Sequence, residues 1–430
     1  MTENRRRQLI AVGAIPATIA GCLAIEMDSV MAVLLSILVG ARVVAEDRRL
    51  IAGISAGLIA WAIALPLFHA EAGGFIDDAV LAAAYAVMAL GLNIIVGFAG
   101  LLDLGYVAFF ALGALTAGWF MSGFFSSAGG GEGLHILVTG LANELPGIHM
   151  NFLIVLLIAV IICTIAGMLI GVPTLRLRGD YIAIVTLAFG EIIGRLVLNG
   201  DEIRIGEEQL TAGRQGITPI DPVDFPFLAE FHPLNLRPWF WTALGLMLLV
   251  LFVNYRLRDS RLGRAWIALR EDEVAAASMG VPLVRTKLLA YGTGAAFGGM
   301  SGAFLASLLN TVNADQFQFS FSIFILAMVV LGGLGSIEGV VLGAVALTYI
   351  NFRLIPDVLN DVPSRVGLEF DLTELSFGIF GFLLVIMMVL RPEGLIPERR
   401  RRLELAEHVG AGQTTGIGVA GEETVYEARA

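Results

Sequence analysis

Apolar runs long enough to cross a bilayer recur from end to end of this sequence, and they leave few folds open to it. A helical span takes about 20 apolar residues at about 1.5 Å each. Only 15% of the 430 residues are charged, against about 25% in an average soluble domain, so a soluble fold could not hide this much apolar surface. We expect spans at 8–25, 29–44, 50–68, 79–98, 104–123, 152–173, 181–199, 239–255, 287–309 and 373–390.

Two segments are expected to be discontinuous. Residues 322–350 are too long for one ordinary span, and their middle reads LGGLGSIEG, where glycines favour a break into two short helices. Segment 104–123 follows the sequence FAGLLDLG, so residues 99–105 are a second candidate for a broken or re-entrant element. Such breaks are tolerated only where other helices or a water-filled cavity cover the freed backbone groups. The predicted fold class is therefore all-α: a polytopic transmembrane helical bundle with broken or re-entrant helices.

Charge separates the loops into two groups, and Lys and Arg are enriched in cytoplasmic loops. The loops predicted to be cytoplasmic are 42–49, 174–180, 256–287 and the segment LRPEGLIPERRRR. The acidic loops predicted to be external are 69–78, 200–238 and 351–372. If 322–350 crosses twice, twelve crossings place both termini in the cytoplasm of a multi-pass protein of the cell inner membrane.

Several classes of chemistry lack their sequence signals. The chain has no G-x-x-x-x-G-K-[S/T] phosphate loop, so ATP hydrolysis would need another chain. It has no H-E-x-x-H or paired-cysteine motif and its five histidines are dispersed, so we expect no metal site. The net charge of −11 argues against nucleic-acid binding. We therefore expect no bound cofactor and no catalytic residues.

The stretch IALREDEVAAASMGV, residues 267–281, looks like a soluble helix between apolar regions. Its three consecutive alanines favour helix, and Gly280 followed by Pro282 ends it. The pattern predicts one short helix with a small face and a charged face. It is either a solvated connector or a helix that docks into a groove on another protein. The candidate residues are Leu269, Arg270, Glu271, Asp272, Glu273, Ala276, Ala277 and Gly280.

Polar residues within the apolar segments are candidates for the translocation path, each with a structural alternative. Asn93 either lines a passage or hydrogen-bonds a neighbouring helix. Asp103 either borders the passage or caps the following helix. Glu191 and Arg195, four residues apart, form a structural ion pair or take part in gating. The break at Gly332, Gly333, Gly335 and Ser336 either contacts a zwitterion or packs helices closely.

A glycine repeat marks the segment GTGAAFGGMSGAF. Gly294, Gly298 and Gly302 lie four residues apart, and small residues at this spacing let helices approach closely. The repeat predicts either tight packing inside this chain or contact with a partner membrane subunit.

Five motifs, in order, resemble one transporter family: GLNIIVGFAGLLDLGYVAFFALGAL, VPTLRLRGDYIAIVTLAFGEII, GRAWIALREDEVAAASMGV, LAMVVLGGLGSIEGVVLGA and LRPEGLIP. Together they resemble the branched-chain amino acid ABC transporter permease of the LivM type. The third motif is similar to the Glu-Ala-Ala cytoplasmic loop that docks such permeases onto their ATPases. The resemblance implies a permease core at 79–397, preceded by a three-helix membrane extension at 1–70. We expect a disordered, acidic cytoplasmic tail at 403–430 because that segment is polar.

The resemblance also implies function and partners. It implies import of leucine, isoleucine and valine, driven by ATP on two separate ATPase subunits. The other expected partners are a LivH-type permease, an extracytoplasmic substrate-binding protein and membrane lipid. Two alternatives stay open: a urea or short-chain amide ABC permease, and an ion-coupled secondary transporter in which Glu191 and Asp103 would be proton sites.

Overall fold

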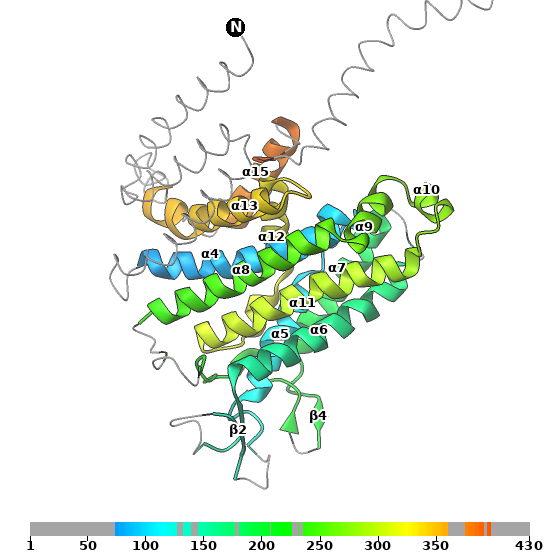
Figure 1. The fold of residues 1–430 in the computed structure, drawn as a ribbon. Coiled ribbons are helices and arrows are strands. Elements are labelled where there is room, and N and C mark those ends of the chain that lie inside the picture. The colour runs from blue at the N-terminus through cyan, green and yellow to red at the C-terminus, as the bar shows by residue number, and fades with distance from the viewer. Residues whose placement is uncertain are drawn as a thin grey trace, which may run out of the picture.

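The computed structural model shows a helical bundle with a few short strands gathered at one end (Figure 1). The predicted spans at 8–25, 29–44 and 50–68, the extension at 1–70 and the tail at 403–430 lie outside the residues that it describes. The structure describes residues 74–126, 132–138, 145–175, 177, 180–206, 208–225, 231, 235–359, 375–390 and 394–396.

Helices make up most of the described chain. They are α4 (Gly74–Leu92), which continues as a π-helix (Asn93–Phe98), α5 (Val107–Phe120), α6 (Phe152–Thr174), α7 (Asp180–Leu198), α8 (Arg237–Asp259), α9 (Arg261–Glu271), α10 (Glu273–Ser278), α11 (Leu283–Leu309), α12 (Phe319–Gly332), α13 (Ile337–Tyr349), which continues as a π-helix (Ile350–Leu359), and α15 (Ser376–Leu390). The short strands are β1 (Met121–Ser122), β2 (Leu134–Ile136), β3 (Ile148–Met150), β4 (Arg204–Ile205) and β5 (Glu208–Gln209).

Six helices among the described residues are long and apolar enough to cross a membrane. They confirm the predicted helical membrane bundle. The span containing α4 and its π-helix and the span of α11 are 83% and 78% buried, whereas those of α6, α7 and α8 are only 28–33% buried. Helices α4 and α11 therefore form the centre of the bundle, and α6, α7 and α8 lie at its outside.

The predicted break in 322–350 is present. Helix α12 ends at Gly332, Gly333 and Gly335 take positive φ angles of 119° and 84°, and α13 starts at Ile337. A side chain at Gly332 would collide with the backbone of Gly339, so the glycines let the two helices pack closely as an antiparallel pair.

The glycine repeat of α11 packs inside this chain. A side chain at Gly294 would collide with Ile95 of the π-helix, and one at Gly302 would collide with the carbonyl of Phe110 on α5. Gly298 contacts Tyr106 and Phe109 in the same region. The first of the two alternatives for this repeat, packing within the chain, is the one the structure shows.

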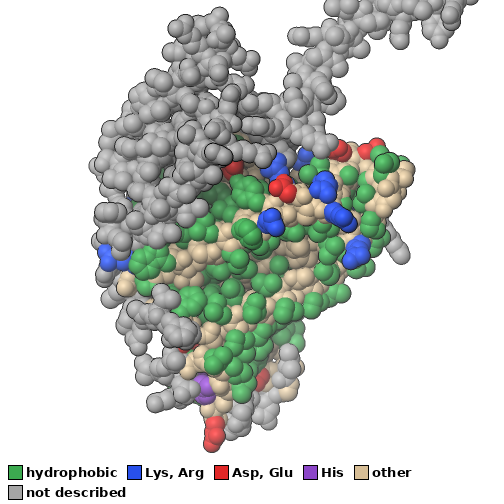
Figure 2. Space-filling view, viewed as in Figure 1, with side chains coloured by type: hydrophobic (Ala, Val, Ile, Leu, Met, Phe, Trp, Pro, Cys, Tyr) green, Lys and Arg blue, Asp and Glu red, His purple; other side chains and the backbone are tan. Residues whose placement is uncertain are grey.

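The two classes of loop lie at opposite ends of the bundle. One end, here called the basic end, carries α9 and α10 together with Arg256, Arg258, Arg261, Arg264, Arg270, Arg285 and Lys287 (Figure 2). The other, the strand end, carries the five strands and the acidic residues Asp201, Glu202, Glu208, Asp221, Asp224 and Asp315. The end of α6, which leads into loop 174–180, also lies at the basic end, because Gly171 near that end packs against Leu288 and Tyr291 near the start of α11.

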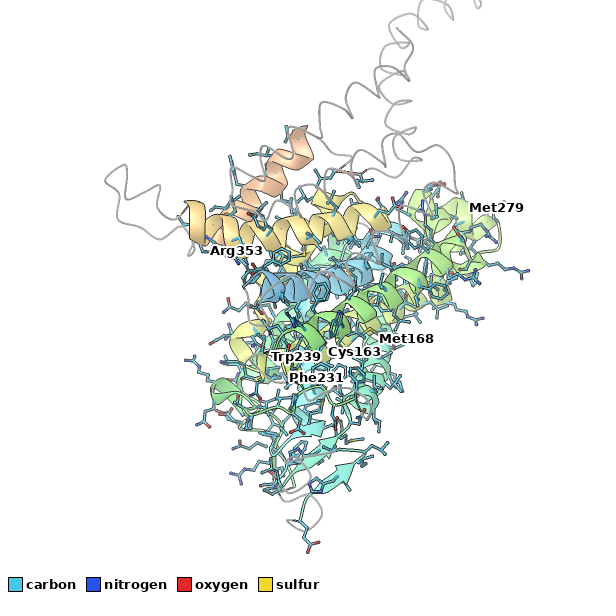
Figure 3. All side chains as sticks on the ribbon, turned by 60° about the vertical axis from the view of Figure 1, so that its left-hand side comes forward. Cys163, Met168, Phe231, Trp239, Met279 and Arg353 are labelled. Atoms are coloured by element: carbon cyan, nitrogen blue, oxygen red, sulfur yellow. The ribbon has the colours of Figure 1, made fainter. Side chains whose placement is uncertain are left out.

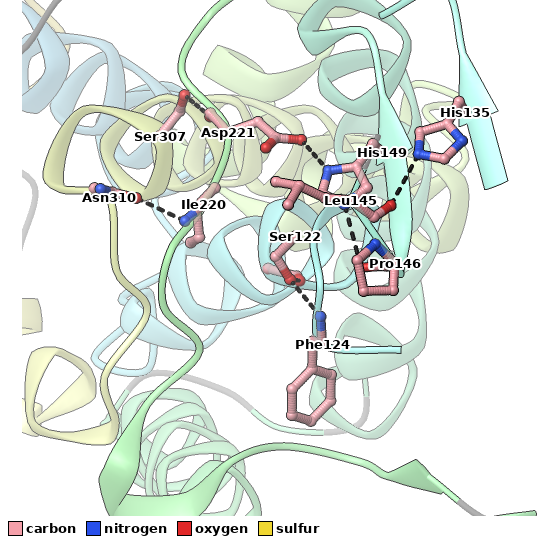
Figure 4. Close-up of polar contacts among 11 residues, drawn as sticks. Ser122, Phe124, His135, Leu145, Pro146, His149, Ile220, Asp221, Ser307 and Asn310 are labelled. Carbon is pink, nitrogen blue, oxygen red and sulfur yellow. Dashed lines mark hydrogen bonds and ion pairs between the residues drawn. The ribbon is translucent and has the colours of Figure 1, made fainter. Parts of the chain in front are cut away.

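A polar network joins the segments of the strand end (Figure 4). Strand β3 pairs with β1 in antiparallel and with β2 in parallel register. His149 Nδ1 lies 2.6 Å from Asp221 Oδ2, and the His135 ring stacks on the His149 ring with centroids 5.6 Å apart. Burial raises the pKa of Asp221 above its usual range, and the His149 hydrogen bond partly offsets this. Ser307 Oγ donates to the Asp221 carbonyl at 2.8 Å, which ties the network to the end of α11.

Candidate coupling and translocation site

The stretch 267–281 is two helices rather than the single helix expected from the sequence. Helix α9 ends at Glu271, and Asp272 takes an extended conformation with φ −155°. Asp272 Oδ1 then accepts hydrogen bonds from the amides of Val274 and Ala275, at 2.8 and 3.0 Å, and so caps α10. An aspartate that bonds nearby amides competes with helix continuation, which is the physical reason for the break. Gly280, with φ 84°, and Pro282 end α10 as expected.

Helix α9 is packed into the chain. Trp266 is fully buried, and its Nε1 donates to the carbonyl of Thr286 on α11 at 2.9 Å. Leu269 is also buried. Arg270 Nη1 donates to the carbonyl of Gly97, at the end of the π-helix that follows α4. Leu269 and Arg270 therefore connect α9 to the bundle.

Helix α10 buries one of its three alanines against the rest of the chain. Ala276 is 4% exposed, whereas Val274 is 63% and Met279 86% exposed. Glu273 Oε1 accepts from Lys287 Nζ of α11 at 2.7 Å, and this Lys287 side chain is only 3% exposed. Ala276 and the Glu273–Lys287 ion pair therefore hold α10 against its own chain, and Ala276 does not belong to the exposed surface of this helix.

The free surface of α10 has apolar residues at both ends. Figure 3 shows Met279 at the edge of the molecule, far from Arg353 at the other end of the helices. Glu271, Asp272, Ala277 and Gly280 are also exposed, and a side chain at Gly280 would meet nothing within 4 Å. We call the exposed surface formed by Val274, Ala275, Ala277, Ser278 and Met279 the α10 outer face.

The two helix breaks meet at Asn93. This residue is fully buried at the start of the π-helix, and its Oδ1 accepts from the amide of Gly335 at 2.9 Å. Its Nδ2 has no hydrogen-bond partner among the described residues. A side chain at Gly97 would collide with both Asn93 and the Gly335 amide. Asn93 therefore bonds the turn between α12 and α13, and the structure brings it together with that break.

Close packing accounts for the glycines of that break. Gly332, Gly333 and Gly335 are buried, and Ser336 Oγ accepts from the amide of Gly339 at 3.1 Å, which caps α13. The amides of Leu395 and Ile396 donate to the carbonyls of Leu331 and Gly332. These two carbonyls at the end of α12 therefore have partners within the chain.

Asp103 lies in the segment between the π-helix and α5. It is 2% exposed, and its Oδ1 accepts a hydrogen bond from the amide of Gly105 at 2.9 Å. This bond closes a short turn between residues 103 and 105. It does not cap α5, which begins at Val107, whose amide donates to Ser322 Oγ on α12. A side chain at Gly105 would collide with the backbone of Thr186, so α7 packs directly on this turn.

Glu191 and Arg195 lie apart from these buried residues. Both side chains are exposed on the outer side of α7, and they form no ion pair with each other.

Within the described ranges there is also no group of three His, Cys, Asp or Glu side chains that could hold a metal ion.

One known family matches most of this chain. Residues 75–388 match the family described as "Branched-chain amino acid transport system / permease component". The chain belongs to this permease family. The permease is 38% identical to the high-affinity branched-chain amino acid transport system permease protein LivM of Escherichia coli (strain K12), over 83% of this chain and 77% of that protein.

More distant relatives carry related names. The permease is 26% identical to the probable branched-chain amino acid transport permease protein LivM of Methanocaldococcus jannaschii, over 73% of this chain and 91% of that protein. It is also 26% identical to the permease protein LivH of Salmonella typhimurium, over 40% of this chain and 49% of that protein. No solved structure matches the permease.

Sequence reasoning missed two features of the permease. The bond from Arg270 to Gly97 joins residues 173 positions apart, and no sequence pattern pairs them. The exposed Met279 had a signal, since it is an apolar residue beside the glycine that ends a helix in a charged loop.

Proposed function

We propose that the permease is the transmembrane subunit of an ATP-driven importer for leucine, isoleucine and valine. The observation that carries this proposal is the family match over residues 75–388, together with 38% identity to a LivM protein over 83% of the chain. The permease would bind no cofactor itself, and ATP would be bound and hydrolysed by two separate ATPase subunits.

The remaining partners follow from the same family. A LivH-type permease would complete the membrane unit, and an extracytoplasmic binding protein would deliver the substrate. We assign the strand end to the binding protein, because its loops are joined into one surface by the β-sheet and by the His149–Asp221 contact. We assign the basic end, and both termini, to the cytoplasmic side of the inner membrane, in keeping with the enrichment of Lys and Arg there.

The α10 outer face is the surface we assign to ATPase docking. Val274 and Met279 expose apolar surface in a charged loop, and apolar side chains of a short helix are typical anchors in a partner's groove. Because α10 is held to the start of α11 by the Glu273–Lys287 ion pair, movement of the docked ATPase would move the start of α11 as well.

A chain of contacts leads from α10 to the helix breaks. Asp272 joins α10 to α9, Arg270 of α9 bonds the Gly97 carbonyl, and Gly97 packs against Asn93, which bonds Gly335. We propose that ATP-driven movement of α9 shifts the π-helix and the α12–α13 break together, and that this shift opens and closes the path for the substrate.

Deleting the gene for this permease tests the substrate. Uptake of labelled leucine, isoleucine and valine should fall together and return when the gene is restored, because one path serves all three. The matched comparison is urea uptake in the same cells, which should not change. Loss of urea uptake with unchanged branched-chain uptake would instead assign the permease to urea or short-chain amides.

A further inference from the structure

We propose that the outer side of α7 is the surface on which a second, related permease subunit packs. The residues of this surface, the α7 stripe, are Tyr181, Ile184, Ala188, Glu191 and Arg195. The identity of the partner rests on the proposed function, which includes a LivH-type permease. The assignment of the surface rests on the chemistry of the stripe itself.

The stripe is continuous, and none of the described residues covers it. Its members follow one another at intervals of three or four residues, so they lie on one side of the helix. All five are exposed, with Tyr181 at 69% and Ile184 at 60%. Only 28% of the Tyr181–Leu198 span is buried, the lowest share among the six candidate spans in the described chain.

Glu191 lies too deep in the span to be hydrated by water at the membrane surface. It is ten residues from Tyr181 and seven from Leu198, or about 15 Å and about 10 Å from the two ends of the span. Ionisable side chains within a span are costly and almost always face the bundle interior or a water-filled cavity. An exposed Glu191 therefore indicates that lipid does not cover this stripe in the assembled protein.

Helix α6 shows what a lipid-facing side looks like in the same chain. Its exposed residues Leu157, Ile161, Ile165 and Leu169 repeat every four positions and are all aliphatic, at 54–66% exposure. Nothing on that side needs a polar partner. The contrast between α6 and α7, two outer helices of similar burial, assigns α6 to lipid and α7 to protein.

The occupant must itself span the membrane, because the stripe does. It must also present a donor opposite Glu191 and an acceptor opposite Arg195, since polar side chains hydrogen-bond across membrane helices. A second, related permease subunit would itself span the membrane and could present such side chains. The inner side of α7 contacts the Asp103 turn through Thr186, whose Oγ1 accepts from the Leu104 amide at 3.1 Å. Movement of a partner packed on α7 would therefore also move the Asp103 turn.

Site-specific photo-crosslinking tests the surface. The photoreactive residue benzoylphenylalanine replaces Ala188 on the α7 stripe or, as the matched control, Ile161 on α6, in cells that co-express the permease, the tagged LivH-type permease and both ATPases. We expect a crosslink to the LivH-type permease from position 188 and none from position 161. Equal yields from both positions, no partner crosslink from position 188, or a crosslink from 188 to a second copy or to this chain's own residues would overturn the proposal.

The charge gives a second, independent test. If Glu191 faced lipid, Glu191→Leu would remove a costly charge and leave copurification of the LivH-type permease unchanged. We expect copurification to fall about five- to thirtyfold, as for one lost interhelical hydrogen bond, while Ile161→Leu has no effect. Copurification of Glu191→Leu at the wild-type level would overturn the proposal. Leucine uptake by the unaltered complex is measured in parallel, so a wrong substrate is distinguished from a wrong interface.

Discussion

Replacing Val274 and Met279 with aspartate is expected to reduce copurification of the ATPase by at least about tenfold. Both side chains are exposed and apolar, at 63% and 86% exposure, and they lie on the α10 outer face. Burying one such side chain in a partner contributes about 1.5–3 kcal/mol, and about 1.4 kcal/mol is a factor of ten in affinity. An aspartate would lose that contribution and bring an unpaired charge into the contact.

The measurement is pull-down of the ATPase in detergent at equal membrane expression. The matched controls are Val274→Ile and Met279→Leu, which keep apolar side chains at the same positions and should retain the ATPase. Insertion of the permease should be unaffected because both residues are exposed at the end of the bundle. Wild-type recovery of the ATPase with the double aspartate variant would show that the α10 outer face is not the docking surface and that α10 is a solvated connector.

Replacing Arg270 with alanine is expected to lower leucine uptake by about ten- to a hundredfold while the ATPase stays bound. Arg270 positions the π-helix through its bond to the Gly97 carbonyl and does not lie on the α10 outer face. A hydrogen bond from a charged group contributes about 1.5–3 kcal/mol, which corresponds to that range of rates if the bond is needed in the transport step. ATP hydrolysis should continue, uncoupled from uptake.

Two variants separate this positioning role from general loss of charge. Arg264→Ala removes an exposed arginine from the same helix. The Arg264 Nη1 donates to the nearby backbone carbonyl of Asp259 at 2.8 Å, so this variant should leave uptake near wild type. Arg270→Lys keeps a donor and should restore part of the uptake. If Arg270→Ala lowers hydrolysis and uptake equally, or neither, the contact chain from α9 to the π-helix does not transmit the movement.

Features set by local chemistry were predictable from the sequence. The glycines Gly332, Gly333 and Gly335 disfavour a helix, and the structure breaks there. The four-residue glycine spacing in α11 predicted close helix packing, which the contacts at Gly294 and Gly302 confirm. Gly280 and Pro282 ended α10 for the same local reasons.

Features set by distant contacts were not predictable. Whether Ala276 faces its own chain or a partner depends on where α11 lies, and the small-residue pattern is the same in both cases. The capping bonds of Asp272 compete with continuation of the helix, and the sequence alone does not show which of the two conformations is more stable. The Asn93–Gly335 bond joins residues 242 apart and needed both breaks to be placed first.

Leucine transport by the purified complex in proteoliposomes tests the central claim most directly. The permease is reconstituted with its LivH-type partner, the binding protein and either the active ATPases or ATPases with an inactivated catalytic residue. Leucine should cross the bilayer only with the active ATPases and with ATP supplied at the basic end. Equal transport with inactive ATPases, driven by an ion gradient, would contradict an ATP-driven importer and identify a secondary transporter.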